Sequence, residues 1–210
     1  MRLHFFFRLC GALAISNKPD LREQTLARRD VLAPDKRAHA SKVLAKIAEF
    51  QITGKTVSAY HAVGSEIDPG PLLDVLANTG AQLALPVLLD REIMVFRRWD
   101  RSQELVPVGF GTLGPDADQP EVFPDLIFAP LAAFSPKGQR IGYGKGHYDR
   151  ALSKMHASGH QPAYVGLAFD EQEVLPFQAE AHDIPLHGVL TPSGLRVFDH
   201  GREALLPFLA

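Results

Sequence analysis

The residues from 138 to 150 have the composition of a phosphate-binding loop, and their sequence is GQRIGYGKGHYDR. Gly142, Gly144 and Gly146 occupy alternate positions in it. Glycine lets the backbone approach a ligand closely and turn successive N–H groups toward an anion. A helix predicted to begin at His147 would add the positive end of its dipole. The segment therefore predicts a site for the phosphates of a nucleotide.

Charged side chains inside this segment support the same interpretation. Arg140 and Lys145 can place positive charge on phosphate oxygens, and Asp149, in the first helical turn, is positioned to bind Mg²⁺. The pattern matches neither the Walker A loop GxxxxGK[ST] nor the dinucleotide fingerprint GxGxxG. The alternative is a tight connection in which the glycines only solve a packing problem. Three alternating glycines with interleaved Arg, Lys and Asp favour phosphate binding.

The flanking elements predict an α/β fold. An apolar run at 126–131 (LIFAPL) is typical of a strand buried on both faces, a helix is predicted over 147–157, and a second strand over 163–169. Such a βαβ unit indicates a mainly parallel sheet with helices on both faces, a Rossmann-like open three-layer sandwich in a single domain. Ligands of these sheets bind beyond the carboxyl ends of the strands.

The preceding residues continue the alternation of elements. Apolar side chains at helical spacing predict a helix from Pro34 to a stop at Gly54, and a second helix is predicted over 69–80. Strands are predicted over 56–62, 81–89 and 93–99, and a long loop over 106–125 because Gly, Pro and Asp are frequent there.

Composition excludes several classes of protein. The 210 residues are 46% hydrophobic and 22% charged, as in ordinary globular domains, and the net charge of −2 gives no basic surface for nucleic acid. Cys10 is the only cysteine, which excludes an intrachain disulfide and a Cys-based zinc cluster and suits a reducing cytoplasm.

The first residues, 1–17, are predicted to be an extension outside the catalytic domain, which would span 18–210. The apolar stretch Leu3 to Ile15 is interrupted by Arg8 and is shorter than the roughly 20 residues of a membrane span. No membrane association is expected, and a signal peptide is the alternative interpretation.

The segment 138–150 resembles the signature G-x-R-x-G-x-G-x-G-[YH]-YDR of the 5-formyltetrahydrofolate cyclo-ligase family. Lys18 with Leu21 and Arg22 resembles the family's N-terminal K-x-x-LR, and residues 65–68 (SEID) resemble its acidic segment on the substrate side. Further similar segments extend the resemblance from Lys18 to Thr191: ALPV at 84–87, MVFRRW at 94–99, PDLI at 124–127 and HDIP at 182–185.

This resemblance implies an enzyme that uses ATP and Mg²⁺ to close 5-formyltetrahydrofolate to 5,10-methenyltetrahydrofolate, releasing ADP and phosphate. ATP would phosphorylate the formyl oxygen, N10 would attack the activated carbon, and phosphate would leave as the ring closes. Lys145 and Arg140 are the expected catalytic residues, and Asp149 and Asp183 the expected magnesium ligands. The expected ATP contacts are Lys18, Arg22, Arg140, Ile141, Gly142, Tyr143, Gly144, Lys145, Gly146, His147 and Tyr148.

On the folate side, the resemblance implies that Glu66 accepts hydrogen bonds from the amino-pyrimidine edge of the pterin. His61, Tyr143 and His147 match positions that line the folate site, and Trp99 is expected to stack on or enclose an aromatic ring. His147 stands where members of the family often have Tyr. A monomer that acts on two small-molecule substrates is expected.

Several alternatives remain open at this stage. Without the resemblance, Lys18 and Arg22 fit a solvated helix face, and Trp99 fits a core residue. Glu180, His182, Asp183 and His187 could form a zinc site, but the two histidines do not have i, i+4 spacing, so Asp183 is expected to bind Mg²⁺. The alternative functions are another ATP- or phosphate-handling α/β enzyme, which would not need Glu66, and a folate- or nucleotide-binding module without turnover.

Overall fold

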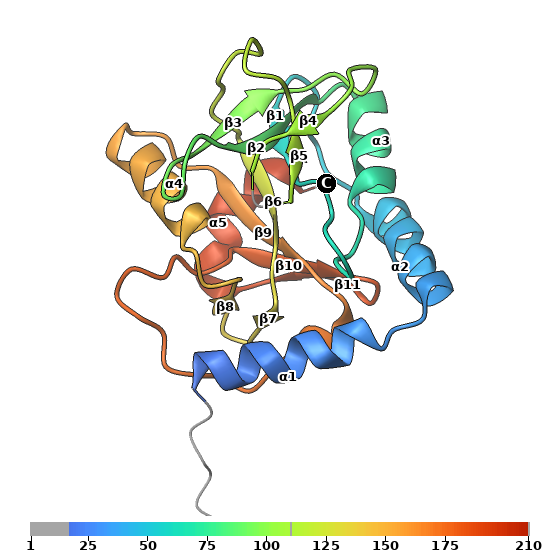
Figure 1. Cartoon of the computed structure of the whole chain (residues 1–210), viewed down its shortest axis with the longest axis vertical. Coiled ribbons are helices and arrows are strands. Elements are labelled where there is room, and N and C mark those ends of the chain that lie inside the picture. The colour runs from blue at the N-terminus through green and yellow to red at the C-terminus, as the bar shows by residue number, and fades with distance from the viewer. Residues whose placement is uncertain (1–16, 110, 210) are drawn as a thin grey trace, which may run out of the picture.

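A computed structural model describes residues 17–109 and 111–209 of the chain. Its centre is a seven-stranded sheet in the order β11-β10-β9-β6-β1-β2-β3 (Figure 1). The strands of this sheet are β1 Thr56–Ser58, β2 Gln82–Leu88, β3 Met94–Arg98, β6 Leu126–Pro130, β9 Ala163–Leu167, β10 Gly188–Thr191 and β11 Gly194–Val197.

The inner strands of the sheet are parallel, and the two edge strands are antiparallel to their neighbours. β1 pairs in parallel with β2 and β6, and β9 pairs in parallel with β6 and β10, whereas β3 and β11 run antiparallel. From β1 the chain moves toward β3, and from β6 it moves the opposite way toward β11. The strand order therefore reverses between β1 and β6, where open α/β sheets bind their ligands.

Helices cover both faces of the sheet, as Figure 1 shows. The helices are α1 Lys18–Asp30, α2 Pro34–Ile47, α3 Gly70–Asn78, α4 His147–Ala157 and α5 Arg202–Leu205. One core cluster joins α2, α3 and α5 to the strands, and a second joins α4 to the other face. Along β6, Leu126 and Phe128 enter the first cluster, while Ile127 and Ala129 enter the second. The strand is buried on both faces, as its continuous apolar sequence predicts.

The predicted α/β class and three-layer arrangement are confirmed, and the helix over 147–157 has the predicted bounds. Other bounds differ. The helix that starts at Pro34 ends at Ile47 rather than at Gly54, and the first strand stops at Ser58 because the chain leaves the sheet there to line a cavity. A two-residue antiparallel pair, β7 Ala133–Phe134 with β8 Arg140–Ile141, leads into the glycine segment.

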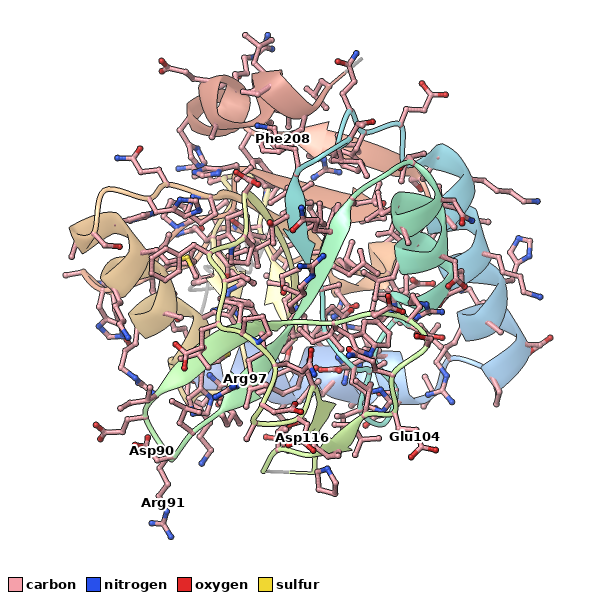
Figure 2. The ribbon with its side chains drawn as sticks, turned by 90° about the horizontal axis from the view of Figure 1, so that it is seen from above. Asp90, Arg91, Arg97, Glu104, Asp116 and Phe208 are labelled. Atoms are coloured by element: carbon pink, nitrogen blue, oxygen red, sulfur yellow. The ribbon has the colours of Figure 1, made fainter. Side chains whose placement is uncertain are left out.

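The segment predicted as one long loop contains a short hairpin, β4 Val106–Pro107 with β5 Leu113–Gly114. Its return to the sheet is fixed by Arg97 of β3, labelled with Asp116 in Figure 2. The Arg97 guanidinium donates hydrogen bonds to the carbonyls of Ala117 and Gln119, the second at 2.6 Å. These side chain–backbone bonds hold a segment that has almost no strand pairing of its own.

The predicted extension lies almost entirely outside the described residues, which begin at Asn17. The Asn17 side chain caps α1 by accepting a hydrogen bond from the Asp20 N–H at 3.0 Å. No helix in the described part of the chain is long and apolar enough to cross a membrane.

We expect Phe128→Ala to lower the free energy of unfolding by about 3–5 kcal/mol, because it leaves a cavity at the centre of the sheet. Phe128 is fully buried and packs edge-on against Phe50, with ring centroids 5.3 Å apart. Phe123→Ala is the matched control: Phe123 is 50% exposed, and its loss is expected to change stability by less than about 1 kcal/mol. Urea unfolding measures the free energy of unfolding of both variants, and an equal loss in the two would contradict the placement of Phe128 in the core.

Candidate active site

A cavity of about 840 Å³ opens at the carboxyl ends of β1, β2 and β6, beside the reversal of strand order. It is bounded by α1, the loop after β1, the hairpin β4–β5 and the glycine segment. It brings together these predicted site residues: Lys18, Arg22, His61, Glu66, Arg140, Ile141, Gly142, Tyr143, Gly144, Lys145, Gly146, His147, Tyr148, Asp149 and Asp183.

The glycine segment has the backbone that its sequence predicts. Gly144 and Gly146 have φ values of +82° and +64°, a left-handed conformation that residues with a Cβ rarely adopt. Gly146 is also the N-cap of α4, so the first N–H groups of that helix are directed toward the end of the segment. Gly142 has an ordinary φ, but a Cβ there would come within 2.7 Å of Arg140. The sequence therefore forms a tight turn at a helix N-terminus.

Lys145 lies between the two left-handed glycines and is exposed to the cavity. Its ammonium makes no hydrogen bond or ion pair with any of the described residues. It is therefore a cation whose charge is available to an anionic ligand.

Arg140, in contrast, is held firmly in place. Its guanidinium donates to Asp149 at 3.1 Å, and both side chains are largely buried, with 8% and 14% of their surfaces exposed. Burial disfavours the charge of Arg140, but Tyr164 and Asp149 outweigh this effect and raise its pKa. The rings of Tyr148 and Tyr164 lie against the guanidinium, 5.6 and 5.8 Å from its central carbon.

Helix α1 presents basic residues to the cavity at helical spacing. Lys18 forms an ion pair with Asp183 at 2.5 Å, and Arg22 donates to the Gly142 carbonyl at 2.7 Å. The latter bond fixes the glycine segment against α1. These two side chains therefore line the cavity and do not form a solvated helix face.

Asp149 and Asp183 line the same wall of the cavity. The Asp149 carboxylate accepts a hydrogen bond from the N–H of Ile184, the residue after Asp183, at 3.2 Å. Asp183 also groups with Glu180 and His182, whose potential ligand atoms lie within 4.8 Å of one another. His187 does not belong to this group, because its Nδ1 accepts a hydrogen bond from the Tyr164 N–H at 3.0 Å.

Glu66 lines the cavity from the loop after β1. Burial raises the pKa of its carboxyl, while hydrogen bonds from the Tyr143 hydroxyl and the Val63 N–H act in the other direction. The bond from Val63 is 2.8 Å long. His61 is exposed at the same wall. The imidazole of His147 lies 2.9 Å from the Arg91 carbonyl, so it contacts the turn between β2 and β3.

The structure does not bring Trp99 to this cavity. Its indole is buried in the core, donates to the Gln103 carbonyl at 3.2 Å and has Arg101 over its ring. Among the other residues that line the cavity are two that the sequence analysis did not consider, Arg29 and Tyr60. Helical spacing was the available signal for Arg29, which lies seven residues after Arg22 on α1.

Comparisons with known proteins agree with the geometry. A model of the "5-formyltetrahydrofolate cyclo-ligase family" matches residues 14–192. The chain belongs to the 5-formyltetrahydrofolate cyclo-ligase family. A cyclo-ligase of Escherichia coli K12 is 35% identical over 148 residues, covering 68% of this chain and 80% of its own length. One from Mycolicibacterium smegmatis is 32% identical, covering 84% of this chain and 94% of its own length.

Solved structures show the same fold. A 5,10-methenyltetrahydrofolate synthetase of Aquifex aeolicus, 27% identical, superposes with a TM-score of 0.72 over 87% of this chain and 93% of its own. A 5,10-methenyltetrahydrofolate synthetase from Mycoplasma pneumoniae, 20% identical, superposes with a TM-score of 0.67 over 84% of this chain and 99% of its own. Enzymes of this family convert 5-formyltetrahydrofolate to 5,10-methenyltetrahydrofolate with ATP, which confirms the predicted family, enzyme class and reaction.

We expect Gly144→Ala to raise the KM for ATP roughly tenfold, because alanine costs about 1–2 kcal/mol in the left-handed region and the glycine segment must shift to relieve it. Its Cβ would also lie 3.4 Å from Arg22. Gly159→Ala is the control: Gly159 has φ +81°, follows α4 away from the cavity, and has open space at its Cβ position. Gly159→Ala should lose a similar amount of stability but keep the wild-type KM for ATP. Equal KM values for the two variants would contradict the assignment of the glycine segment to ATP binding.

Proposed function

We propose that this cavity binds ATP along the glycine segment and 5-formyltetrahydrofolate against Glu66, so that the phosphoryl donor and acceptor meet inside it. The observation that carries the proposal is the convergence of two groups on one cavity. One is Lys145, which lies between left-handed glycines and has no partner within residues 17–109 and 111–209, and the other is the half-buried carboxylate of Glu66, from a distant part of the chain. A phosphate-handling enzyme of another class would have no need for Glu66.

On the ATP side, Lys18, Arg22 and Arg140 bind phosphate oxygens together with the N–H groups at the start of α4. Arg140 and Lys18 are held at the cavity by their carboxylate partners, so both cations are in place before the nucleotide binds. Lys145 contributes most to catalysis, because its ammonium can follow the transferring phosphoryl group as charge develops on its oxygens.

On the folate side, Glu66 accepts hydrogen bonds from the amino-pyrimidine edge of the pterin, which requires the ionised carboxylate. Tyr143 and the Val63 N–H favour that form against the effect of burial. His61, Tyr143 and His147 line the same cavity and complete the folate contacts.

The chemistry then follows from position and charge. The formyl oxygen attacks the γ-phosphorus, the bond to the β-phosphate oxygen breaks, and ADP leaves. N10 attacks the activated carbon and releases its proton to the departing phosphate or to water, the carbon–oxygen bond breaks, and phosphate leaves as the five-membered ring closes. Holding the reacting groups together supplies the main acceleration, because the protein forms no covalent bond with either substrate.

Asp149 and Asp183 would hold Mg²⁺. Both offer the carboxylate oxygens that this ion prefers, they face the same cavity, and the Ile184 N–H bond keeps them close. The bound ion supplies positive charge to the phosphate oxygens of ATP.

We further propose that the enzyme acts as a monomer in the cytoplasm on these two small molecules, which is consistent with its single cysteine and its net charge of −2.

The test of this function is the ATP-dependent formation of the 5,10-methenyl product, followed by its absorbance. The wild-type protein should produce it together with equimolar ADP, and Lys145→Ala should reduce kcat by roughly 100-fold or more. Lys154→Ala removes an exposed lysine on α4 outside the cavity and should retain full activity. ATP binding without product from the wild type would favour the binding-module alternative, and wild-type turnover by Lys145→Ala would remove its catalytic role.

We expect Asp149→Asn and Asp183→Asn each to raise the Mg²⁺ concentration required for half-maximal activity by roughly tenfold or more, because each removes a charged oxygen ligand. Asp199→Asn is the control, since Asp199 is fully exposed and lies outside the cavity. A Mg²⁺ titration at saturating ATP measures the effect. An unchanged requirement in both variants would mean that the metal is held by the nucleotide alone.

A further inference from the structure

Arg29 is a buried cation beside the cavity with no role in the function described above. Its side chain belongs to α1, and only 5% of the residue surface is exposed. A buried guanidinium is costly unless several of its N–H groups have partners. The partners of Arg29 therefore show what this charge is used for.

Three separate segments provide these partners. The Nε group donates to Ser65 Oγ at 2.9 Å, and Nη1 donates to the Tyr143 hydroxyl at 2.7 Å and to the Leu131 carbonyl at 3.4 Å. Ser65 in turn donates to the carboxylate of Asp30. One guanidinium thus joins α1, the loop after β1, the end of β6 and the glycine segment.

Two of these partners are directly linked to the folate-side acid. Ser65 precedes Glu66 in the chain, and the Tyr143 hydroxyl, which accepts from Arg29, donates to the Glu66 carboxylate. Tyr143 is at the same time part of the glycine segment, next to Gly144. The position of Glu66 and the position of the glycine segment are consequently fixed by the same side chain.

We propose that Arg29 is a positioning residue that couples the glycine segment to the folate side of the site. An ordered glycine segment then improves folate binding, and bound folate in turn improves the binding of ATP at the glycine segment. This inference rests on the proposed substrates. The planar fork of arginine is needed because Nε and Nη1 hold different segments in fixed directions, which a lysine ammonium cannot reproduce. The coupling is reciprocal: whatever factor ATP adds to folate affinity, folate adds to ATP affinity.

The charge of Arg29 has a separate effect from its geometry. Glu66 is surrounded by Arg29 of α1, His61 of its own loop, Tyr143 and Tyr148 of the glycine segment and α4, and Tyr60. Burial raises the pKa of Glu66, and Arg29 is among the groups that lower it. Removing the positive charge raises this pKa further, so the pH below which folate binding is lost moves upward.

The experiment compares Arg29→Lys, which keeps the charge, and Arg29→Met, which does not, with Arg28→Met as the control. Arg28 is the preceding residue of α1, is exposed and lies outside the cavity. Affinity for 5-formyltetrahydrofolate is measured with and without a non-hydrolysable ATP analogue, and its pH dependence is measured for each protein. Arg28→Met should match the wild type in folate affinity without the analogue, in folate affinity with the analogue, and in the pH dependence of folate affinity.

For Arg29→Lys we expect the gain in folate affinity caused by the ATP analogue to fall to near unity, with the acid limit of folate binding unchanged. For Arg29→Met we expect the same loss of coupling, a folate affinity lower by roughly tenfold or more, and an acid limit at higher pH. A merely structural role would lower thermal stability without moving the pH limit or the coupling.

Wild-type coupling in both variants would overturn the proposal, and so would a wild-type protein whose folate affinity does not respond to the ATP analogue. If Arg29→Met does not fold, Arg29→Lys decides the coupling alone. Failure of the proposed function looks different, because the wild-type protein would then form no methenyl product and these variants would have no activity to lose.

Discussion

The pairing of basic residues with carboxylates around one cavity is the interaction on which the rest of the site depends. The positive charges needed for phosphate would repel one another if nothing held them. Arg140 is held by Asp149, and Lys18 by Asp183, in partly or largely buried ion pairs. Removing either partner would leave a charge in a poorly solvated place, which is the strongly destabilising case for a buried pair. The same carboxylates are the proposed ligands of Mg²⁺, so binding of the metal and the phosphates would exchange one set of opposite charges for another.

Helix α1 connects these interactions, although it packs little against the large sheet. Its contacts with the site are polar: Lys18 with Asp183, Arg22 with the Gly142 carbonyl, and Arg29 with Ser65 and Tyr143. Figure 1 shows the helix lying across the end of the molecule beside β7 and β8. Leu21 and Leu26 add apolar packing against a small core cluster that includes Ile141. Because Lys18, Arg22 and Arg29 also line the cavity, the position of α1 and the geometry of the site are interdependent.

The sheet supplies the fixed frame. Its order reverses between β1 and β6, and the carboxyl ends of these strands diverge into the loop that carries Glu66 and the turn that leads to the glycine segment. Two core clusters, one on each face, pack the strands together, and the loop after β1 is anchored to one of them by Tyr60 and Ile67 while it presents Glu66 to the cavity. This arrangement explains how Glu66 and the glycine segment, from distant parts of the sequence, share one cavity.

The sequence alone determined the features that depend on neighbours along the chain. Alternating glycines before a helix predicted a segment whose backbone can turn its N–H groups toward a ligand, the apolar run of β6 predicted a strand buried on both faces, and the spacing of strands and helices predicted the α/β class. The signature residues also indicated the family, because their order in the chain is itself the signal.

Only the tertiary structure decided the features that depend on contacts between distant segments. It placed Trp99 in the core, because a tryptophan fits an apolar interior as well as a ligand surface, and local sequence does not distinguish the two. It revealed Arg29, whose partners lie in three other segments. It also paired Arg140 and Lys18 with particular carboxylates and left Lys145 without a partner among the described residues, since ion pairing depends on distance in space rather than on separation in sequence.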